Sequence, residues 1–222
     1  MGLFYLIRHG VTEWNAENRM CGRSDIPLSE AGRQQAEVLA KRLKLIPLEA
    51  LYSSPLKRAL ETARLISELA GLQPILDERL VELDYGEWEG KLLADILRNE
   101  PATYRAWDAD PAQLAPPGGE SGLAAQQRIV SFLDSLAGKH PQGHVLVVSH
   151  KTVCRLAICH VLGVSPSEYR RRLILSNAAL SIIQSQPWGW QLITFNDTSH
   201  LSALGLGARE SGLGFREPVP NP

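Results

Sequence analysis

Two apolar runs that each end in a histidine constrain the fold of this 222-residue chain more than any other feature. Residues 3–7 lead into Arg8-His9-Gly10, and residues 145–148 lead into Ser149-His150. Short apolar runs of this kind are typical of buried strands. Because the carboxyl ends of strands border the ligand crevice in open α/β sheets, the two histidines are predicted to meet at one site.

Helical patterns alternate with apolar strand patterns along the rest of the chain. The expected helices lie at residues 29–47, from Ser54-Pro55 onward, and at 92–99, 123–137 and 152–162. The further expected elements are short strands at 50–53 and 74–76, an edge hairpin at 180–195, and loops at 11–28 and 116–121. This order predicts an α/β fold of three layers, α/β/α, with a mostly parallel central sheet and a C-terminal hairpin at its edge.

The length of the chain suits one domain, which we expect to span residues 1–202. Residues 203–222 are rich in glycine and proline without apolar periodicity, and they are predicted to form a mobile C-terminal tail. The chain enters its first strand at once, without a basic leader and an apolar signal core, so a cytoplasmic protein is expected.

The net charge and the cysteine spacing exclude several classes of protein. Lysine and arginine number 23 against 24 acidic residues, a net charge of -1, which argues against a general nucleic-acid or membrane-surface binder. No apolar run approaches the roughly 20 residues that span a bilayer. The three cysteines are odd in number and lack C-x-x-C spacing, so neither a disulfide framework nor a zinc knuckle is predicted. A small molecule is the expected partner.

Four basic side chains, Arg8, His9, Arg58 and His150, would form a cationic cradle if the fold brought them into one pocket. Guanidinium groups bind the oxygens of a phosphoryl group through charge-assisted hydrogen bonds. Arg58 lies near the start of a predicted helix, where the helix dipole favours anions, so a bound anion would explain this cation. The helix after His150 would add backbone N–H donors at its N-terminus.

The cradle permits phosphoryl transfer to an imidazole. A neutral histidine is a nucleophile near pH 7 and a tolerable leaving group when phosphorylated, so His9 is the candidate nucleophile. The leaving alcohol needs a proton, and Glu82 is the candidate donor. Glu82 would then act as the base when water hydrolyses the phosphohistidine.

The motifs resemble those of the histidine phosphatase superfamily, also called phosphoglycerate mutase-like. The similar blocks follow one another from about residue 4 to 201: Arg8-His9-Gly10 with Thr12, Trp14 and Asn15; Ser53-Ser54-Pro55 with Arg58-Ala59 and Thr62-Ala63; Glu82 before Tyr85-Gly86 and Trp88-Glu89-Gly90; Gly118-Gly119-Glu120-Ser121; and Val148-Ser149-His150. The tripeptide alone is a weak signal, but five ordered blocks are a strong one.

The resemblance implies a phosphoglycerate mutase-like fold and a role for each matching residue. His9 would be phosphorylated, Glu82 would donate the proton, and Arg8, Arg58 and His150 would bind the phosphate. The further substrate contacts that the resemblance implies are Asn15, Cys21, Gly22, Tyr85 and the backbone at Lys151. Members of this type need neither a metal nor another cofactor, and the sequence offers no dedicated ligand cluster.

The resemblance favours a phosphatase over a mutase. A lysine and an arginine pair expected in the mutases match Leu93 and Asp108-Ala109 here, and the long insertion before Gly118 is missing. Small phosphorylated metabolites, phosphoserine first, are the expected substrates, and His200 could fold over the site to contact a substrate carboxylate. The alternatives are an α-ribazole or broad-specificity phosphatase, a phosphoglycerate mutase, and a non-catalytic phospho-ligand binding module. A homodimer is left open.

Overall fold

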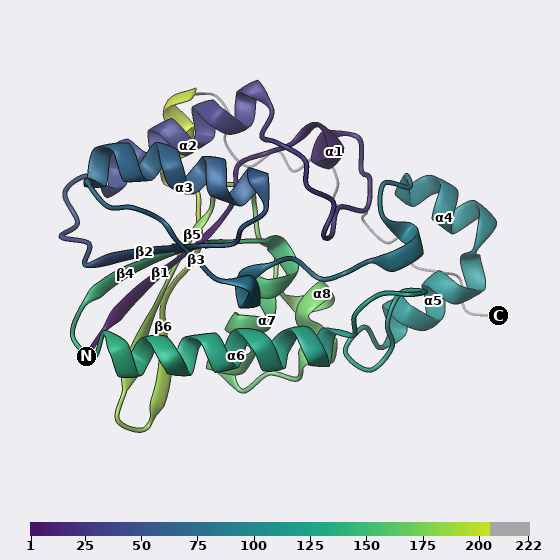
Figure 1. Cartoon of the computed structure of the whole chain (residues 1–222). Helices are drawn as coiled ribbons and strands as arrows, with labels where there is room; N and C mark the ends of the chain where they lie inside the picture. The colour runs from purple at the N-terminus through teal and green to yellow at the C-terminus, as the bar shows by residue number, and fades with distance from the viewer. Residues whose placement is uncertain (205–222) are drawn as a thin grey trace.

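A mixed sheet of six strands forms the centre of the molecule in the computed structural model, which describes residues 1–204 (Figure 1). The strand order is β3-β2-β4-β1-β5-β6. The strands are β1 (Leu3–Arg8), β2 (Ala50–Ser53), β3 (Ile75–Leu76), β4 (His144–Ser149), β5 (Leu180–Gln186) and β6 (Gly189–Asp197). The predicted tail begins at residue 203, and its residues 205–222 lie outside the described residues.

The sheet combines a parallel part with an antiparallel edge. β1, β2, β3 and β4 run parallel, with β1 and β4 side by side at the centre. β5 pairs antiparallel with β1, and β6 extends the sheet as the outer strand of a hairpin. The predicted α/β class, the mostly parallel sheet and the C-terminal edge hairpin are therefore confirmed.

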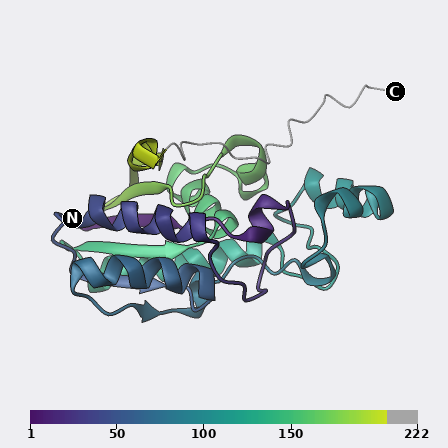
Figure 2. The ribbon, with the colours of Figure 1, turned by 90° about the horizontal axis from the view of Figure 1, so that it is seen from above.

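Helices cover both faces of the sheet (Figures 1 and 2). On one face, α2 (Glu30–Leu43) and α3 (Lys57–Ala70) pack on the β1 side chains Tyr5 and Ile7. On the other face, α6 (Gly122–Lys139) and α7 (Lys151–Leu162) pack on Phe4 and Leu6. Successive side chains of a strand point to opposite faces, so the continuous apolar run of β1 serves both layers.

The ends of the long helices follow from local hydrogen bonds. The Ser29 hydroxyl accepts the Gly32 N–H at the start of α2, and the Ser121 hydroxyl accepts the Ala124 N–H at the start of α6. α3 begins at Lys57, later than the predicted Ser54-Pro55, because residues 54–56 stay non-helical and the Ser54 hydroxyl accepts the Leu56 N–H.

Among the helices that the sequence did not predict, two lie at the predicted site motifs or beside a predicted helix. α1 (Glu13–Ala16) interrupts the predicted loop of residues 11–28, held by a capping box between Thr12 and Asn15. α5 (Pro101–Ala109) follows α4 (Leu93–Asn99), begins at a proline and buries Tyr104 and Trp107 at helical spacing. Figure 2 shows α4 and α5 extending beyond the sheet, past the end near α1.

The remaining helical segments are short. They are η1 (Glu78–Leu80), η2 (Gly86–Trp88), η3 (Pro166–Glu168), α8 (Tyr169–Arg172) and η4 (Ser199–Leu204). Within residues 1–204, no helix combines the length and the apolar character needed to cross a membrane.

Candidate active site

The two histidines of the opening motif lie together at the carboxyl ends of β1 and β4. Arg8 is paired with Ser149 in the parallel ladder, and the His9 N–H donates to the Ser149 carbonyl at 3.0 Å. The rings of His9 and His150 follow directly, with their centroids 5.1 Å apart. Both side chains are almost completely buried. The two histidines therefore lie at one site, as predicted from the sequence.

A backbone carbonyl fixes the His9 ring. Its Nδ1 lies 2.6 Å from the Gly10 oxygen, a contact that requires a proton on Nδ1 and leaves the Nε2 lone pair available. The pKa of His9 is held well below its ordinary value, first by burial and then by the positive charges of Arg58 and Arg8. The ring is therefore neutral near pH 7, which is the nucleophilic form.

His150 precedes α7 and is neutral for the same reasons. Burial lowers its pKa well below the ordinary value, and Arg58 and His9 add to that effect. Its Nε2 is 2.8 Å from the Ser54 hydroxyl, at the end of β2. Among the described residues its Nδ1 has no hydrogen-bond partner, although the atom is buried. A buried polar atom without a partner is rare in folded proteins, and a bound ligand would satisfy it.

Two arginines contribute positive charge from different elements. Arg58, fully buried in the first turn of α3, donates to the Gly22 carbonyl at 2.6 Å and to the Ser24 carbonyl at 2.7 Å. Its Nε has no partner among the described residues. Arg8 ends β1 and donates to the Leu175 carbonyl. The Arg58 guanidinium has five N–H donors and uses two of them on these carbonyls, which leaves donors for an anion.

Glu82 reaches the same site from the segment after η1. One carboxylate oxygen accepts the Leu83 N–H at 2.8 Å, and the other accepts the Thr152 N–H at 3.1 Å. The second bond connects the carboxylate to the first turn of α7, directly after His150. The side chain is 4 % exposed. The five residues predicted to carry the chemistry are thus gathered by β1, β4, α3 and the loop after η1.

Four of the predicted substrate contacts border this cluster. Tyr85 bonds the Thr152 hydroxyl at 3.2 Å, and burial raises its pKa to about 12. Burial also raises the pKa of Cys21 to about 11, in a loop close to the charges of Arg58 and Glu82. The Gly22 carbonyl binds Arg58, and Lys151 opens α7.

Asn15 is held by Asn177, a residue that no sequence pattern indicated. Its side-chain oxygen accepts the Thr12 N–H and one N–H of the Asn177 amide, both at 3.1 Å. The Asn177 amide also donates to the His9 carbonyl at 3.2 Å. With the Asn15 oxygen occupied twice, its NH₂ group is the part left for a ligand. Only the fold brings Asn177 here, because it follows β1 by more than 160 residues.

His200 does not join the cluster. It lies in η4, where one ring nitrogen bonds the Ala178 carbonyl and the other bonds the Arg42 guanidinium, both at 3.1 Å. Arg42 also bonds Ser199 and Asp197, so these contacts attach η4 to α2. Both ring nitrogens are occupied, and the expected contact of His200 with a substrate carboxylate has no support in these bonds.

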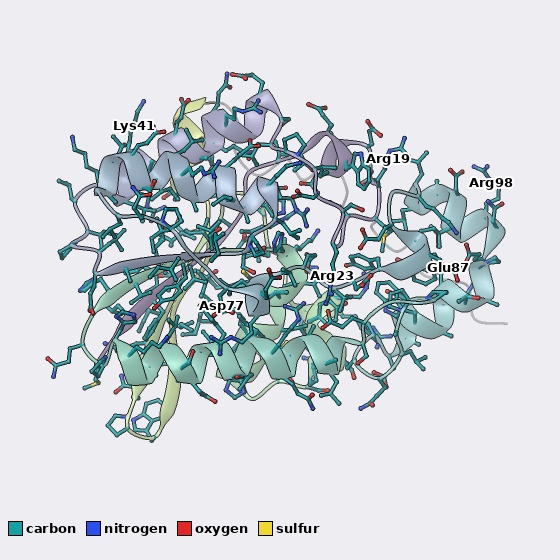
Figure 3. All side chains as sticks on the ribbon, viewed as in Figure 1. Arg19, Arg23, Lys41, Asp77, Glu87 and Arg98 are labelled. Carbon is teal, nitrogen blue, oxygen red and sulfur yellow. The ribbon has the colours of Figure 1, made fainter. Side chains whose placement is uncertain are left out.

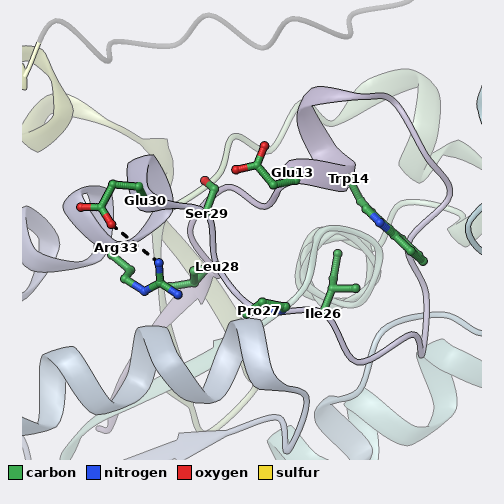
Figure 4. A pocket seen from close by; sticks show the side chains of 8 residues that line it. All are labelled: Glu13, Trp14, Ile26, Pro27, Leu28, Ser29, Glu30 and Arg33. Atoms are coloured by element: carbon green, nitrogen blue, oxygen red, sulfur yellow. Dashed lines mark ion pairs between the residues drawn. The ribbon is translucent and has the colours of Figure 1, made fainter.

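A surface hollow lies beside α1 and the start of α2 (Figure 4). Trp14, Ile26, Pro27 and Leu28 form its apolar lining, and the rim carries the ion pair between Glu30 and Arg33 at 3.7 Å. None of the five residues predicted to carry the chemistry lines it. Within residues 1–204, no three His, Cys, Asp or Glu side chains are grouped to hold a metal ion.

Comparison with known proteins agrees with this geometry. The family model of the histidine phosphatase superfamily (branch 1) matches residues 4–198. Phosphoserine phosphatase 1 of Hydrogenobacter thermophilus is 34% identical over 206 residues, which are 93% of this chain and 97% of that protein. A protein of Cronobacter sakazakii named as a probable phosphoglycerate mutase is 36% identical over 207 residues, 91% of this chain and 96% of its own.

A solved structure extends the similarity to three dimensions. It is a mutant phosphoserine phosphatase from Entamoeba histolytica in complex with phosphoserine, with a TM-score of 0.80 and 30% identity. The match covers 90% of this chain and 100% of that one. The matched length, the ordered motifs and the shared fold lead to one conclusion: the chain belongs to the histidine phosphatase superfamily, branch 1.

Proposed function

We propose that this protein hydrolyses phosphate monoesters of small metabolites through a phosphohistidine formed on His9. One observation carries the proposal: His9 is buried and neutral beside Arg8 and Arg58, with Nδ1 bound to the Gly10 carbonyl and Nε2 without a hydrogen bond to any residue from 1 to 204. A nucleophilic lone pair next to cationic groups suits attack on a phosphorus whose oxygens carry negative charge.

In the first step, Nε2 of His9 attacks phosphorus and the P–O bond to the alcohol breaks. Glu82 donates a proton to the departing oxygen. Arg8 and Arg58 donate to the peripheral oxygens of the phosphoryl group, where charge is spread in the transition state. The products of this step are the free alcohol and the phosphorylated ring.

In the second step, water attacks the phosphorus of the phosphohistidine. The Glu82 carboxylate takes a proton from that water, the P–N bond breaks, and inorganic phosphate leaves with the electron pair returned to Nε2. Because burial and the two arginines favour neutral imidazole, His9 returns to its starting form without gaining a proton.

Phosphoserine is the substrate that we infer, and a phosphoglycerate mutase is the second candidate. The named phosphoserine phosphatases among the relatives support the first, and the mutase named in Cronobacter sakazakii keeps the second open. Two positions favour hydrolysis. Leu93 and Asp108 stand where the mutases carry basic residues, and Asp108 is already paired with Arg170 at 2.9 Å.

The test is a screen of phosphomonoesters with EDTA present, comparing the wild type with His9→Ala. The panel contains phosphoserine, α-ribazole phosphate and 3-phosphoglycerate, and mutase activity is followed as conversion of 3-phosphoglycerate to 2-phosphoglycerate. We expect phosphate release from phosphoserine by the wild type and a phosphoenzyme trapped by acid quenching. Activity that disappears with EDTA and survives in His9→Ala contradicts the proposal.

A further inference from the structure

Within the part of the chain that the structure describes, the Glu89 carboxylate accepts hydrogen bonds only from backbone N–H groups and from the hydroxyl of one serine. Glu89 directly follows η2, in the Trp88-Glu89-Gly90 block. One carboxylate oxygen accepts the Arg23 N–H at 2.6 Å, and the other accepts the Ser24 N–H at 2.7 Å and bonds the Ser24 hydroxyl. The Tyr85 N–H approaches the first oxygen at 3.4 Å. Glu89 thus binds both N–H groups of the loop at residues 23–24.

The opposite side of the same loop faces Arg58. The carbonyls of Gly22 and Ser24 accept the two guanidinium hydrogen bonds of Arg58, at 2.6 and 2.7 Å. The Gly22 carbonyl and the Arg23 N–H belong to one peptide group. That peptide group therefore joins Glu89 to Arg58, with its N–H on the carboxylate and its C=O on the guanidinium.

Charge and packing both favour this arrangement. The positive end of the peptide dipole meets an anion and the negative end meets a cation, so each hydrogen bond is charge-assisted. A side chain at Gly22 would collide with the Glu89 carboxylate and the Leu83 carbonyl, which explains the glycine at this position.

Resting on the proposed function, we propose that Glu89 is a positioning residue for Arg58, acting through the peptide group between Gly22 and Arg23. Arg58 has two of its five N–H groups on loop carbonyls, and its Nε has no partner among residues 1–204. With the loop held, the remaining donors stay directed at the phosphate. Loss of Glu89 frees the loop, and the guanidinium loses its orientation.

The test is the affinity for inorganic phosphate, measured by calorimetry so that the readout does not depend on turnover. Glu89→Gln keeps the shape of the side chain but removes its charge and one acceptor. We expect phosphate binding to weaken about tenfold, the loss typical of one or two charge-assisted hydrogen bonds. Glu87→Gln is the matched control, because Glu87 is exposed in the same segment and lies toward α5 (Figure 3).

A double-mutant cycle with Arg58→Lys separates positioning from general destabilisation. Arg58→Lys keeps the charge but loses the fork that holds both carbonyls. If Glu89 acts through Arg58, Glu89→Gln weakens phosphate binding less than twofold further in that background. Independent fold-changes that multiply, or unchanged affinity in the single variant, overturn the inference.

Two further measurements test the role of Glu89 if the first variant does not fold, and separate that role from the proposed function. If Glu89→Gln fails to fold, Ser24→Ala removes only the hydroxyl contact and is expected to weaken phosphate binding two- to threefold, again only when Arg58 is present. Unchanged binding in Ser24→Ala would then reject the inference. Absence of phosphomonoesterase activity in the wild type counts against the proposed function, and phosphate affinity of the variants decides on Glu89 alone.

Discussion

The strand-end half of the site and the loop half are built differently. Arg8 is the last residue of β1, and His9 and His150 directly follow β1 and β4, so the backbone ladder fixes where all three lie. Arg58 and Glu82 instead depend on hydrogen bonds to loops and to a helix terminus. The sheet positions the residues of the strand-end half, whereas hydrogen bonds position the residues of the loop half.

The two halves also have different roles in the proposed reaction. The strand-end half holds the nucleophile, whose position must not vary during attack on phosphorus. The loop half holds the groups that meet the leaving oxygen and the phosphate. Changes in the strand-end half should therefore abolish the reaction for every substrate, and changes in the loop half should depend on the substrate or on pH.

The largest effect is expected for His9→Ala. Without the nucleophile, kcat should fall at least about 10⁴-fold for every phosphomonoester, because no phosphoenzyme can form. Steady-state phosphate release and acid-quench trapping measure this. His160→Ala, at an exposed position near the end of α7, is the control and should retain full activity. If His9→Ala kept a tenth of the activity or more, His9 would not be the nucleophile.

Glu82→Gln should have a smaller effect that depends on the leaving group. With phosphoserine, whose alkoxide needs a proton, kcat should fall about 10²- to 10⁴-fold. With p-nitrophenyl phosphate, whose phenolate is stable without a proton, the first step should change little. Single-turnover formation of the phosphoenzyme with both substrates measures the contrast. Equal losses for the two substrates would mean that Glu82 does not donate the proton.

Arg58→Ala should shift the pH profile of kcat/KM and should also weaken phosphate binding. His9 must be neutral to attack, and its lowered pKa keeps it neutral as the pH falls through the ordinary histidine value of 6.5. The acid limb of kcat/KM should therefore lie below that pH in the wild type. Removing the Arg58 charge raises the pKa of His9, so the limb should shift to higher pH.

The control for this shift is Arg98→Ala, which removes an exposed arginine from α4 (Figure 3). Its profile should coincide with that of the wild type once the ionisation of the substrate has been measured separately. A limb that stays in place in Arg58→Ala would show that the charge of Arg58 does not reach His9.

The smallest effect is expected for His200→Ala, which lies outside both halves. Loss of the bonds to Arg42 and Ala178 should cost about 1–2 kcal/mol and lower Tm by a few degrees. KM for phosphoserine should change less than twofold. Phosphoethanolamine lacks the carboxylate of phosphoserine. If KM rose for phosphoserine but not for phosphoethanolamine, His200 would contact the substrate carboxylate.

The sequence predicted the strand-end half from local pattern. An apolar run followed by Arg8-His9-Gly10 indicates a buried strand that ends in polar groups, and the same pattern at His150 places a second group at the same sheet edge. Ser29 likewise marked a helix start by its capping chemistry. The helix α5 was missed, although Pro101 and the spacing of Tyr104 and Trp107 offered a signal.

What the sequence determined by itself is the set of short-range features: strand and helix spans, caps, and the residues at strand ends. Only the tertiary structure decided that Asn177 bonds His9 and Asn15, that Glu89 reaches Arg58 through a peptide group, and that His200 bonds Arg42. The physical reason is distance along the chain. Hydrogen bonds between residues dozens to more than a hundred positions apart leave no periodic trace, because they arise only when packing of the apolar faces has fixed the backbone.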